Sequence, residues 1–335
     1  MSIRFAINGV GRIGRALIRV ASQRPDLELV AVNDLASADQ LASLLARDSL
    51  HGPFPGDVDA DAGTLRINGR KIQVSREPTL KSIPWLDLEP SVVVDATGLA
   101  KSRTAASELL QQPVQKVLVS ANAEDFDLTI CLGINHQSYD PQQHHLLSAA
   151  SCTTNCLAPM LDVLNREFGV ENALFNTVHS YNNDQRLLSY PHSDPRRARA
   201  AALNMIPTTT SASHAIHRVL PGLEGRVDGF AVRVPTPNVS LIDLVTTLAG
   251  PTTVEAINQA FSTAAKDTLR GIVQVTDEEL VSSDFMGNPH SAIVDLPLTA
   301  EVDSKLFRVV AWYDNEWGHA SRLADLVDFV GRTSS

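Results

Sequence analysis

The segment GVGRIG, residues 9–14, constrains the fold of this chain more than any other feature. An apolar strand-like run, residues 3–8, precedes it, and apolar residues at helical spacing, among them Leu17 and Val20, follow it. A second strand-like run, residues 27–33, ends at Asp34, twenty residues after the last glycine of the segment. This strand–turn–helix–strand context is typical of a dinucleotide-binding fingerprint.

The residues of this fingerprint have separate physical roles. Gly9 permits a tight turn, Gly11 lets the backbone approach a pyrophosphate, and Gly14 lets the helix pack closely on the strand. The start of the helix presents free N–H groups to the phosphates. Asp34 accepts hydrogen bonds from ribose hydroxyls in this interpretation, which favours NAD over a 2′-phosphorylated cofactor. The alternative is a glycine-rich turn of an ordinary α/β domain, in which Asp34 only caps a helix.

Strand-like and helix-like segments alternate in the first half of the chain, which indicates a doubly wound α/β domain. The β-branched runs 92–95 and 117–120 are typical of buried parallel strands, and Asn68-Gly69 predicts a hairpin. The second half has longer strand-like runs, with a helix expected over about 155–168. We therefore predict a Rossmann-type parallel sheet in residues 1–150, with the C-terminal helix 318–335 packing back onto it. Residues 151–317 are expected to form an α+β domain with an antiparallel sheet.

Charge and cysteine content narrow the range of partners. The chain has 28 Lys and Arg against 38 Asp and Glu, a formal net charge of −10. Nucleic-acid binding requires a basic face, so we expect no nucleic-acid partner, whereas a few arginines can hold a small phosphorylated ligand. No apolar stretch approaches the roughly 18 residues that span a bilayer, and the N-terminus does not resemble a secretory signal. The three cysteines predict a reducing, cytoplasmic location rather than a disulfide scaffold.

A cysteine and a histidine are candidates for chemistry. Cys152 lies where the pattern changes and a helix begins, and a helix N-terminus stabilises a thiolate. Cys156 follows one helical turn later, so the alternatives are a buried inert pair or a metal site. No metal is expected, because a second Cys/His pair at ligand spacing is missing. His179 ends a strand-like run and opens a polar loop, where it is either a base or an ordinary loop residue.

Six segments of the chain resemble the glyceraldehyde-3-phosphate dehydrogenase family. They are INGVGRIGR (7–15), ASCTTNC (150–156), VHSYNNDQ (178–185), RRARAAALNMIPTTT (196–210), RVPTPNVS (233–240) and WYDNEWG (312–318). They follow the order of the family over almost the whole chain. The resemblance implies an NAD-dependent enzyme of glycolysis and gluconeogenesis that oxidises D-glyceraldehyde 3-phosphate to 1,3-bisphosphoglycerate with inorganic phosphate. It also implies a cytoplasmic homotetramer whose catalytic domain is residues 151–317.

The same resemblance assigns roles to individual residues. Cys152 is the nucleophile and His179 its partner, as a thiolate–imidazolium pair; a thiohemiacetal, a thioester and an acyl phosphate follow in turn. The cofactor contacts carried over are Gly9, Gly11, Arg12, Ile13, Gly14, Asp34, Thr97, Ser120 and Asn315. The substrate and phosphate contacts are Ser151, Thr153, Asn182, Asp184, Thr210, Ser211 and Arg233. Leu35 and Pro191 are similar to the NAD-type members of the family.

Several positions depart from the family pattern. Asn182 stands in place of a threonine, Ser211 and His214 stand in place of a glycine and a lysine, and His319 replaces a common aromatic residue. The substitutions at 182 and 211 alter the side chain and the backbone available to bind phosphate, so they affect the expected substrate preference. The three arginines Arg196, Arg197 and Arg199 match an inter-subunit segment of the family, or they form a solvated basic face.

Two other functions are alternatives to a glyceraldehyde-3-phosphate dehydrogenase. Erythrose-4-phosphate dehydrogenase uses the same cysteine chemistry, and DFMGNPHSAIVD (284–295) looks somewhat like that branch. Tyr181, Asn183 and the PTTT segment (207–210) look like the phosphorylating glycolytic branch, which we favour. A non-enzymatic redox-sensing or interaction protein would show a degraded site, and none is visible at the catalytic and cofactor positions.

Overall fold

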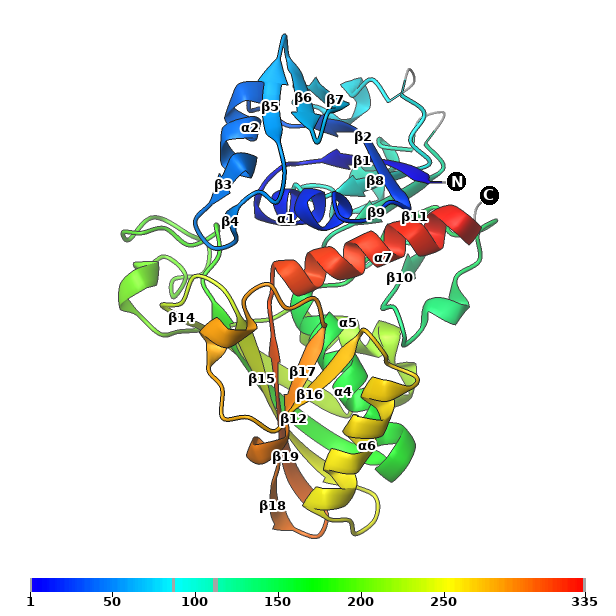
Figure 1. Ribbon diagram of the computed structural model, residues 1–335. Coiled ribbons are helices and arrows are strands. Elements are labelled where there is room, and N and C mark those ends of the chain that lie inside the picture. The colour runs from blue at the N-terminus through cyan, green and yellow to red at the C-terminus, as the bar shows by residue number, and fades with distance from the viewer. Residues whose placement is uncertain (1, 86–87, 111–113, 334–335) are drawn as a thin grey trace. The chain divides into compact units, whose positions relative to one another are not determined.

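The computed structural model of the chain describes residues 2–85, 88–110 and 114–333. Two compact units make up the structure, and each is described by itself (Figure 1). The first unit comprises Met1–Leu132, His136–Ala150 and Ala320–Ser335, and the second comprises Gly133–Asn135 and Ser151–His319. The chain thus returns to the first unit within its last helix.

The first unit is built on a nine-stranded sheet in the order β10-β11-β9-β8-β1-β2-β7-β6-β5. Its strands are β1 (Ile3–Asn8), β2 (Leu27–Asn33), β5 (Val58–Asp61), β6 (Thr64–Ile67), β7 (Arg70–Ser75), β8 (Val92–Asp95), β9 (Lys116–Val119), β10 (Leu128–Thr129) and β11 (Leu146–Ser148). The pairs from β10 through β7 are parallel, and the β5–β6–β7 hairpins are antiparallel. The two-residue strands β3 (Arg47–Asp48) and β4 (Gly52–Pro53) pair with each other. The predicted doubly wound parallel sheet is confirmed.

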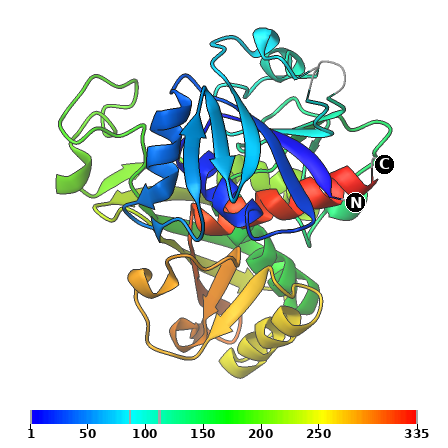
Figure 2. The same ribbon diagram turned by 45° about the horizontal axis from the view of Figure 1, so that its top comes forward.

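Hydrophobic clusters cover both faces of this sheet. The helices of the unit are α1 (Arg12–Ala21), α2 (Ala38–Ala46), α3 (Arg103–Ser107) and most of α7 (Trp317–Thr333). Phe5 of β1 belongs to one buried cluster with Leu17 of α1 and Leu323 of α7, whereas its neighbour Ala6 belongs to a second cluster with Ala106 of α3. This alternation follows from the two-residue period of a strand. Both views show the red helix α7 alongside the blue strands (Figures 1 and 2).

The second unit contains an eight-stranded, mostly antiparallel sheet in the order β13-β14-β12-β15-β19-β17-β16, with β18 paired to β19. Its strands are β12 (Val170–Ser180), β13 (Ile206–Thr208), β14 (Val227–Val234), β15 (Ser240–Leu248), β16 (Val273–Thr276), β17 (Ala292–Asp295), β18 (Ala300–Asp303) and β19 (Leu306–Tyr313). The antiparallel sheet predicted for this part of the chain is confirmed, but two of its pairs, β12–β14 and β16–β17, are parallel. The strand patterns did not indicate these two pairs.

Three helices pack on the sheet of the second unit: α4 (Cys152–Phe168), α5 (Ala212–Val219) and α6 (Val254–Lys266). The labels of Figure 1 place α4 and α6 on one side of this sheet. Large apolar side chains are exposed on β12, β14 and β15, namely Leu174, Phe230 and Val245. Leu174 lies directly opposite Val245 in the strand register. Among the described residues, no helix is long and apolar enough to span a bilayer.

Candidate functional site

The turn between β1 and α1 has the backbone shape that the fingerprint predicts. Gly9 has a φ of +92°, which favours glycine, and a Cβ there would lie 2.8 Å from Thr97. A Cβ on Gly14 would lie 2.2 Å from the carbonyl oxygen of Gly9, so only glycine lets the helix come this close. Gly11 instead faces open space, with no atom within 4 Å of a Cβ placed there. This space at the start of α1 is the kind of cradle that a pyrophosphate needs.

The carboxylate of Asp34 is held in place at the end of β2. Its two oxygens accept the backbone N–H groups of Val10 (2.8 Å) and Ala36 (2.9 Å). A pocket of about 310 Å³ opens here, and its lining includes Gly9, Gly11, Asp34, Leu35, Thr97 and Leu99. Each carboxylate oxygen has a further lone pair, so Asp34 can still accept from ribose hydroxyls. The residues present therefore fit the adenosine half of a dinucleotide.

Polar side chains at the last residues of three adjacent strands support this turn. Asn8 donates to Asp95 (2.7 Å), Asn33 donates to Asn8 (2.9 Å), and Thr97 donates to Asp95 (2.9 Å). Burial raises the pKa of Asp95, and the donated hydrogen bonds act against that rise. Asn8, Asn33 and Asp95 were not predicted as part of the site, whereas Thr97 was; a polar residue that ends each buried parallel strand is a usable signal. Ser120, which directly follows β9, donates its backbone N–H to the carbonyl of Asp95.

Arg12 makes a different contact from the one expected. Its guanidinium forms a 2.6 Å ion pair with Asp48, whose side chain is only 5% exposed. Burial alone would raise the pKa of Asp48, but the backbone N–H groups of Leu50 and His51 and the Arg12 charge bring it down to about 2. The pyrophosphate contact of Arg12, like that of its neighbour Ile13, stays a prediction.

The reactive-cysteine candidate and the histidine candidate lie together in the second unit. Ser151 caps α4 by accepting the backbone N–H of Thr154 (3.1 Å), so the helix begins at Cys152, as expected for that cysteine, and three residues before the start of about 155 that the apolar pattern indicated. The Cys152 Sγ lies 3.6 Å from Nε2 of His179, the penultimate residue of β12. Cys156 is fully buried in the next turn, and burial raises its pKa well above the usual value. Cys152 is therefore the thiol that has a possible base beside it.

Nε2 of His179 faces the sulfur, and the neighbours of Nδ1 bear on which nitrogen carries the proton. Two groups with opposite requirements face Nδ1. The carbonyl oxygen of Ser180, 2.7 Å away, can only accept, whereas the Arg233 guanidinium, 2.8 Å away, can only donate and also donates to that carbonyl at 3.0 Å. The Ser180 contact favours a proton on Nδ1 and a lone pair on Nε2, and the Arg233 contact favours the reverse. Burial and then the Arg233 charge lower the pKa of His179 to about 3. The ring is therefore neutral at pH 7 and can accept a proton.

Opposing effects determine the protonation state of the Cys152 sulfur. Burial raises the pKa of Cys152, while the charge of Arg233 and hydrogen bonds at the start of α4 lower it. Since burial disfavours both charged groups, the neutral thiol–imidazole form is favoured before substrate binds. The thiolate–imidazolium pair implied by the family resemblance stays a prediction.

The hydroxyl residues expected at the phosphate sites are divided between two environments. Thr153 is buried, and its hydroxyl contacts the Tyr313 hydroxyl (3.0 Å), which in turn contacts Thr177 (2.8 Å). Thr210 lies before α5 and accepts the backbone N–H of Ala212 (3.2 Å). The cap position of α5 is taken by Ser211, whose side chain makes no capping hydrogen bond. The Thr210 hydroxyl, and not the Ser211 side chain, therefore satisfies the first backbone N–H group of α5.

Arg197 is an additional cation at this loop that the sequence analysis assigned elsewhere. Its guanidinium donates to the Thr208 hydroxyl (2.8 Å), the Thr209 carbonyl (3.1 Å) and the Asp184 carboxylate (3.2 Å). It therefore lies on the PTTT segment and is not simply part of a solvated basic face. Asn182 is exposed, and its backbone carbonyl accepts from residue 185.

Asn315 lies in the connection between β19 and α7 and is 7% exposed. Its Oδ1 accepts hydrogen bonds from the hydroxyls of Ser180 (2.9 Å) and Ser240 (3.0 Å). Because Ser180 directly follows His179, the candidate base and the residue expected to hold the nicotinamide share one strand end.

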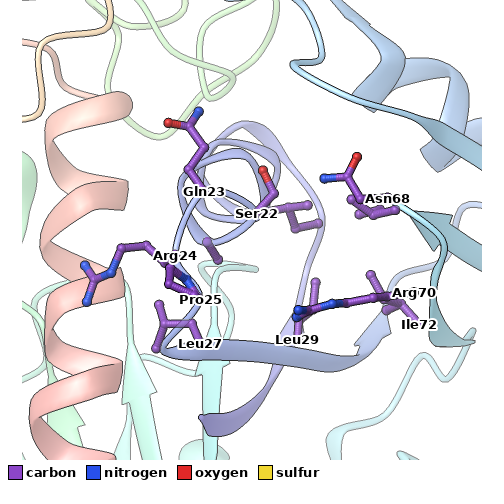
Figure 3. A pocket seen from close by; sticks show the side chains of 12 residues that line it. Ser22, Gln23, Arg24, Pro25, Leu27, Leu29, Asn68, Arg70 and Ile72 are labelled. Atoms are coloured by element: carbon purple, nitrogen blue, oxygen red, sulfur yellow. The ribbon is translucent and has the colours of Figure 1, made fainter.

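A second hollow of the first unit is separate from these residues. It measures about 390 Å³, and its lining includes Gln23, Leu27, Leu29, Arg70 and Ile72 (Figure 3). None of the predicted site residues lines it. In the described part of the chain, no group of three or more His, Cys, Asp or Glu side chains could hold a metal ion.

Comparison with known proteins gives a consistent result for both units. Residues 3–103 match the model of the glyceraldehyde 3-phosphate dehydrogenase NAD binding domain, and residues 151–315 match that of the C-terminal domain. The glyceraldehyde-3-phosphate dehydrogenase of Geobacillus stearothermophilus is 46% identical over 330 residues, 98% of each chain. Glyceraldehyde-3-phosphate dehydrogenase 1 of Bacillus subtilis (strain 168) is 45% identical over 332 residues, 99% of each chain. The predicted family and its NAD cofactor are confirmed: this chain belongs to the glyceraldehyde-3-phosphate dehydrogenase family.

Proposed function

We propose that this protein oxidises D-glyceraldehyde 3-phosphate to 1,3-bisphosphoglycerate with NAD and inorganic phosphate. The observation that carries the proposal is the thiol of Cys152, at the start of α4, 3.6 Å from Nε2 of His179. An electrophilic carbon that forms a covalent bond to sulfur is the substrate class that such a pair suits. The relatives' names specify the glyceraldehyde 3-phosphate enzyme and favour it over the erythrose 4-phosphate alternative.

In the proposed mechanism, Cys152 forms a covalent bond to the aldehyde carbon, and His179 transfers the protons. The sulfur forms a bond to the aldehyde carbon while its proton passes to Nε2 of His179 and on to the new hydroxyl group. His179 then accepts the hydroxyl proton as the carbon is oxidised to the thioester. Bound NAD supplies the acceptor for the hydride in this oxidation. Inorganic phosphate displaces the sulfur, and the acyl phosphate leaves while Cys152 regains its proton. The backbone N–H groups at the start of α4 stabilise the carbonyl oxygen as charge develops on it.

The anionic groups must be held locally, because the chain carries a net charge of −10. Arg233, beside His179, and Arg197, on the PTTT segment, are the cations placed for this. We assign Arg233, Asp184 and Asn182 to the substrate phosphate. The second set, Ser151, Thr153, Thr210 and Ser211, is assigned to inorganic phosphate.

The cofactor contacts divide in the same way. The glycines at 9, 11 and 14, Arg12 and Ile13 are assigned to the pyrophosphate, and Asp34 to the adenosine ribose. Thr97 and Ser120 are assigned to the middle of the cofactor, and Asn315 to the nicotinamide carboxamide. We propose 1–150 with 318–335 as the NAD-binding domain and 151–317 as the catalytic domain.

We also propose that the protein assembles as a homotetramer and works in the cytoplasm. The exposed apolar residues Leu174, Phe230 and Val245 on the second sheet support self-association, because monomeric proteins rarely leave such side chains together in water. All three cysteines are free, which suits a reducing compartment. Sedimentation velocity tests the assembly.

Steady-state rates on the two aldehydes, with and without inorganic phosphate and with NAD or NADP, test the function. We expect phosphate-dependent oxidation of glyceraldehyde 3-phosphate with NAD. A phosphate-independent preference for erythrose 4-phosphate would overturn the proposal. The C152S variant should lose acylation while binding NAD with unchanged affinity, and substantial dehydrogenase activity in that variant would contradict the assigned nucleophile.

A further inference from the structure

The amide of Asn315 is held from one side by two buried serines. The hydroxyls of Ser180 (2.9 Å) and Ser240 (3.0 Å) both donate to its Oδ1. Ser180 is 0% exposed and Ser240 is 2% exposed. The Nδ2 of Asn315 has no hydrogen-bond partner among the described residues of the second unit. One end of the amide is thus saturated, and the other end remains a donor.

The bonding of the serines determines which way the amide is turned. The Ser240 Oγ itself accepts the backbone N–H of Ser180 (3.1 Å), so its own proton is directed to Asn315. In the part of the chain that the structure describes, neither hydroxyl has another acceptor. Turning the Asn315 amide by 180° would place its NH₂ against both hydroxyls and leave two buried O–H protons without acceptors. Buried donors of that kind are costly, so the amide is locked with Nδ2 facing away from the serines.

The backbone that carries Asn315 is held just as firmly. The carboxylate of Asp314, which is 1% exposed, accepts hydrogen bonds from four groups. These are Asn238 Nδ2 (2.9 Å) and the backbone N–H groups of Gly287 (2.8 Å), Glu316 (2.9 Å) and Trp317 (2.8 Å). Asp314 therefore fixes the position of the residue, and the two serines fix the rotation of its amide.

We propose that Ser180 and Ser240 are positioning residues that make Asn315 a pure hydrogen-bond donor to the carbonyl oxygen of the nicotinamide carboxamide. The inference rests on the proposed function, in which Asn315 contacts that group. If Oδ1 were free instead, Asn315 could equally accept from the carboxamide NH₂ and allow the ring to bind in either orientation. The locked amide removes that ambiguity.

A cofactor analogue separates these two modes of recognition. In 3-acetylpyridine adenine dinucleotide a methyl group replaces the carboxamide NH₂, while the carbonyl acceptor remains. The affinities of NAD and of this analogue are measured by calorimetry on the cofactor-free protein, without any aldehyde. In S180A/S240A the freed Oδ1 can accept from NH₂, so the affinity ratio should shift toward NAD by up to about tenfold, the effect of one hydrogen bond. N315A, which loses the donor shared by both interactions and introduces no acceptor, should weaken both ligands alike.

Three variants guard against a purely structural effect. S240A alone should shift the ratio in the same direction, and S240T, which keeps the hydroxyl, should restore the wild-type ratio. T246V is the matched control: Thr246 lies on the same strand β15, is 1% exposed, and donates its hydroxyl to a backbone carbonyl. Its ratio should equal that of the wild type. An unchanged ratio in S240A and in the double variant, or an equal loss of both affinities, would overturn the proposal. The test does not depend on which aldehyde is oxidised, so its failure is distinguishable from failure of the proposed function.

Discussion

His319 makes the stability of this protein depend on pH in a way that can be calculated. It lies in the first turn of α7 and is 5% exposed, and burial lowers its pKa to about 4. In the unfolded chain the same group titrates near 6.5. Between these two values the unfolded state binds a proton that the folded state does not, so stability falls as the pH falls through this window. Replacing His319 with Phe removes that contribution.

The two pKa values give the expected size of the effect. Between about pH 7.5 and about pH 5, the wild type should lose roughly 2 kcal/mol of unfolding free energy through His319, approaching about 3 kcal/mol at lower pH. The assay is urea denaturation of wild type and H319F at both pH values and one protein concentration. Any packing change caused by Phe is present at both pH values and cancels in the difference. H319F should therefore lose about 2 kcal/mol less than the wild type.

A second histidine variant controls for the loss of an imidazole as such. His214 lies on α5 and is exposed, so H214Q should show the same dependence on pH as the wild type. If wild type and H319F lost the same free energy on acidification, the reasoning from burial would be refuted.

Three further predictions concern the cofactor, the base and the core. D34S removes the charge that opposes a 2′-phosphate, so the NADP-to-NAD ratio of kcat/KM should rise at least about tenfold, and an unchanged ratio would contradict the role of Asp34. Because burial and Arg233 hold the pKa of His179 near 3, the acylation burst of NADH should not decline between about pH 7 and about pH 5.5. A decline of the burst with a midpoint near pH 6.5 would contradict the lowered pKa of His179. Lys116, 2% exposed, donates to two backbone carbonyls of the 140–145 loop, so K116M should cost about 1–3 kcal/mol in urea denaturation, and unchanged stability would contradict this.

Features governed by local geometry could be predicted from the sequence. Gly9 and Gly14 are required by the turn itself, through a positive φ and a close helix–strand contact. The start of α4 at Cys152 follows from the Ser151 cap, and the hairpin follows from Asn68-Gly69, whose φ angles are both positive. Each of these depends on a few neighbouring residues, so a short window of sequence contains the information.

Two helices of the second unit were missed although a signal was present. In α6, Ile257, Phe261 and Ala264 are buried at helical spacing, and Thr253 caps the helix by accepting from Ala256. Recognition of this period would have predicted helices between the longer strands.

Contacts between distant segments could not be predicted in this way. Arg197 reaches the PTTT segment eleven to twelve residues later, and the polar strand ends Asn8, Asn33 and Asp95 meet only because β1 lies between β2 and β8. Which strands pair is decided by the packing of the whole sheet. Short segments of a single sequence therefore do not determine which strands pair.

The pairing of β12 with β14 shows how much of the site depends on such a choice. The two strands are parallel, and His179 is the register partner of Arg233. An antiparallel β14 in the same place would carry Arg233 to the opposite end of the sheet, several residues from His179. The base would then lose the neighbouring charge that lowers its pKa, and the substrate phosphate would lose its proposed cation. The parallel pair is therefore what joins a predicted base and a predicted anion-binding residue into one site.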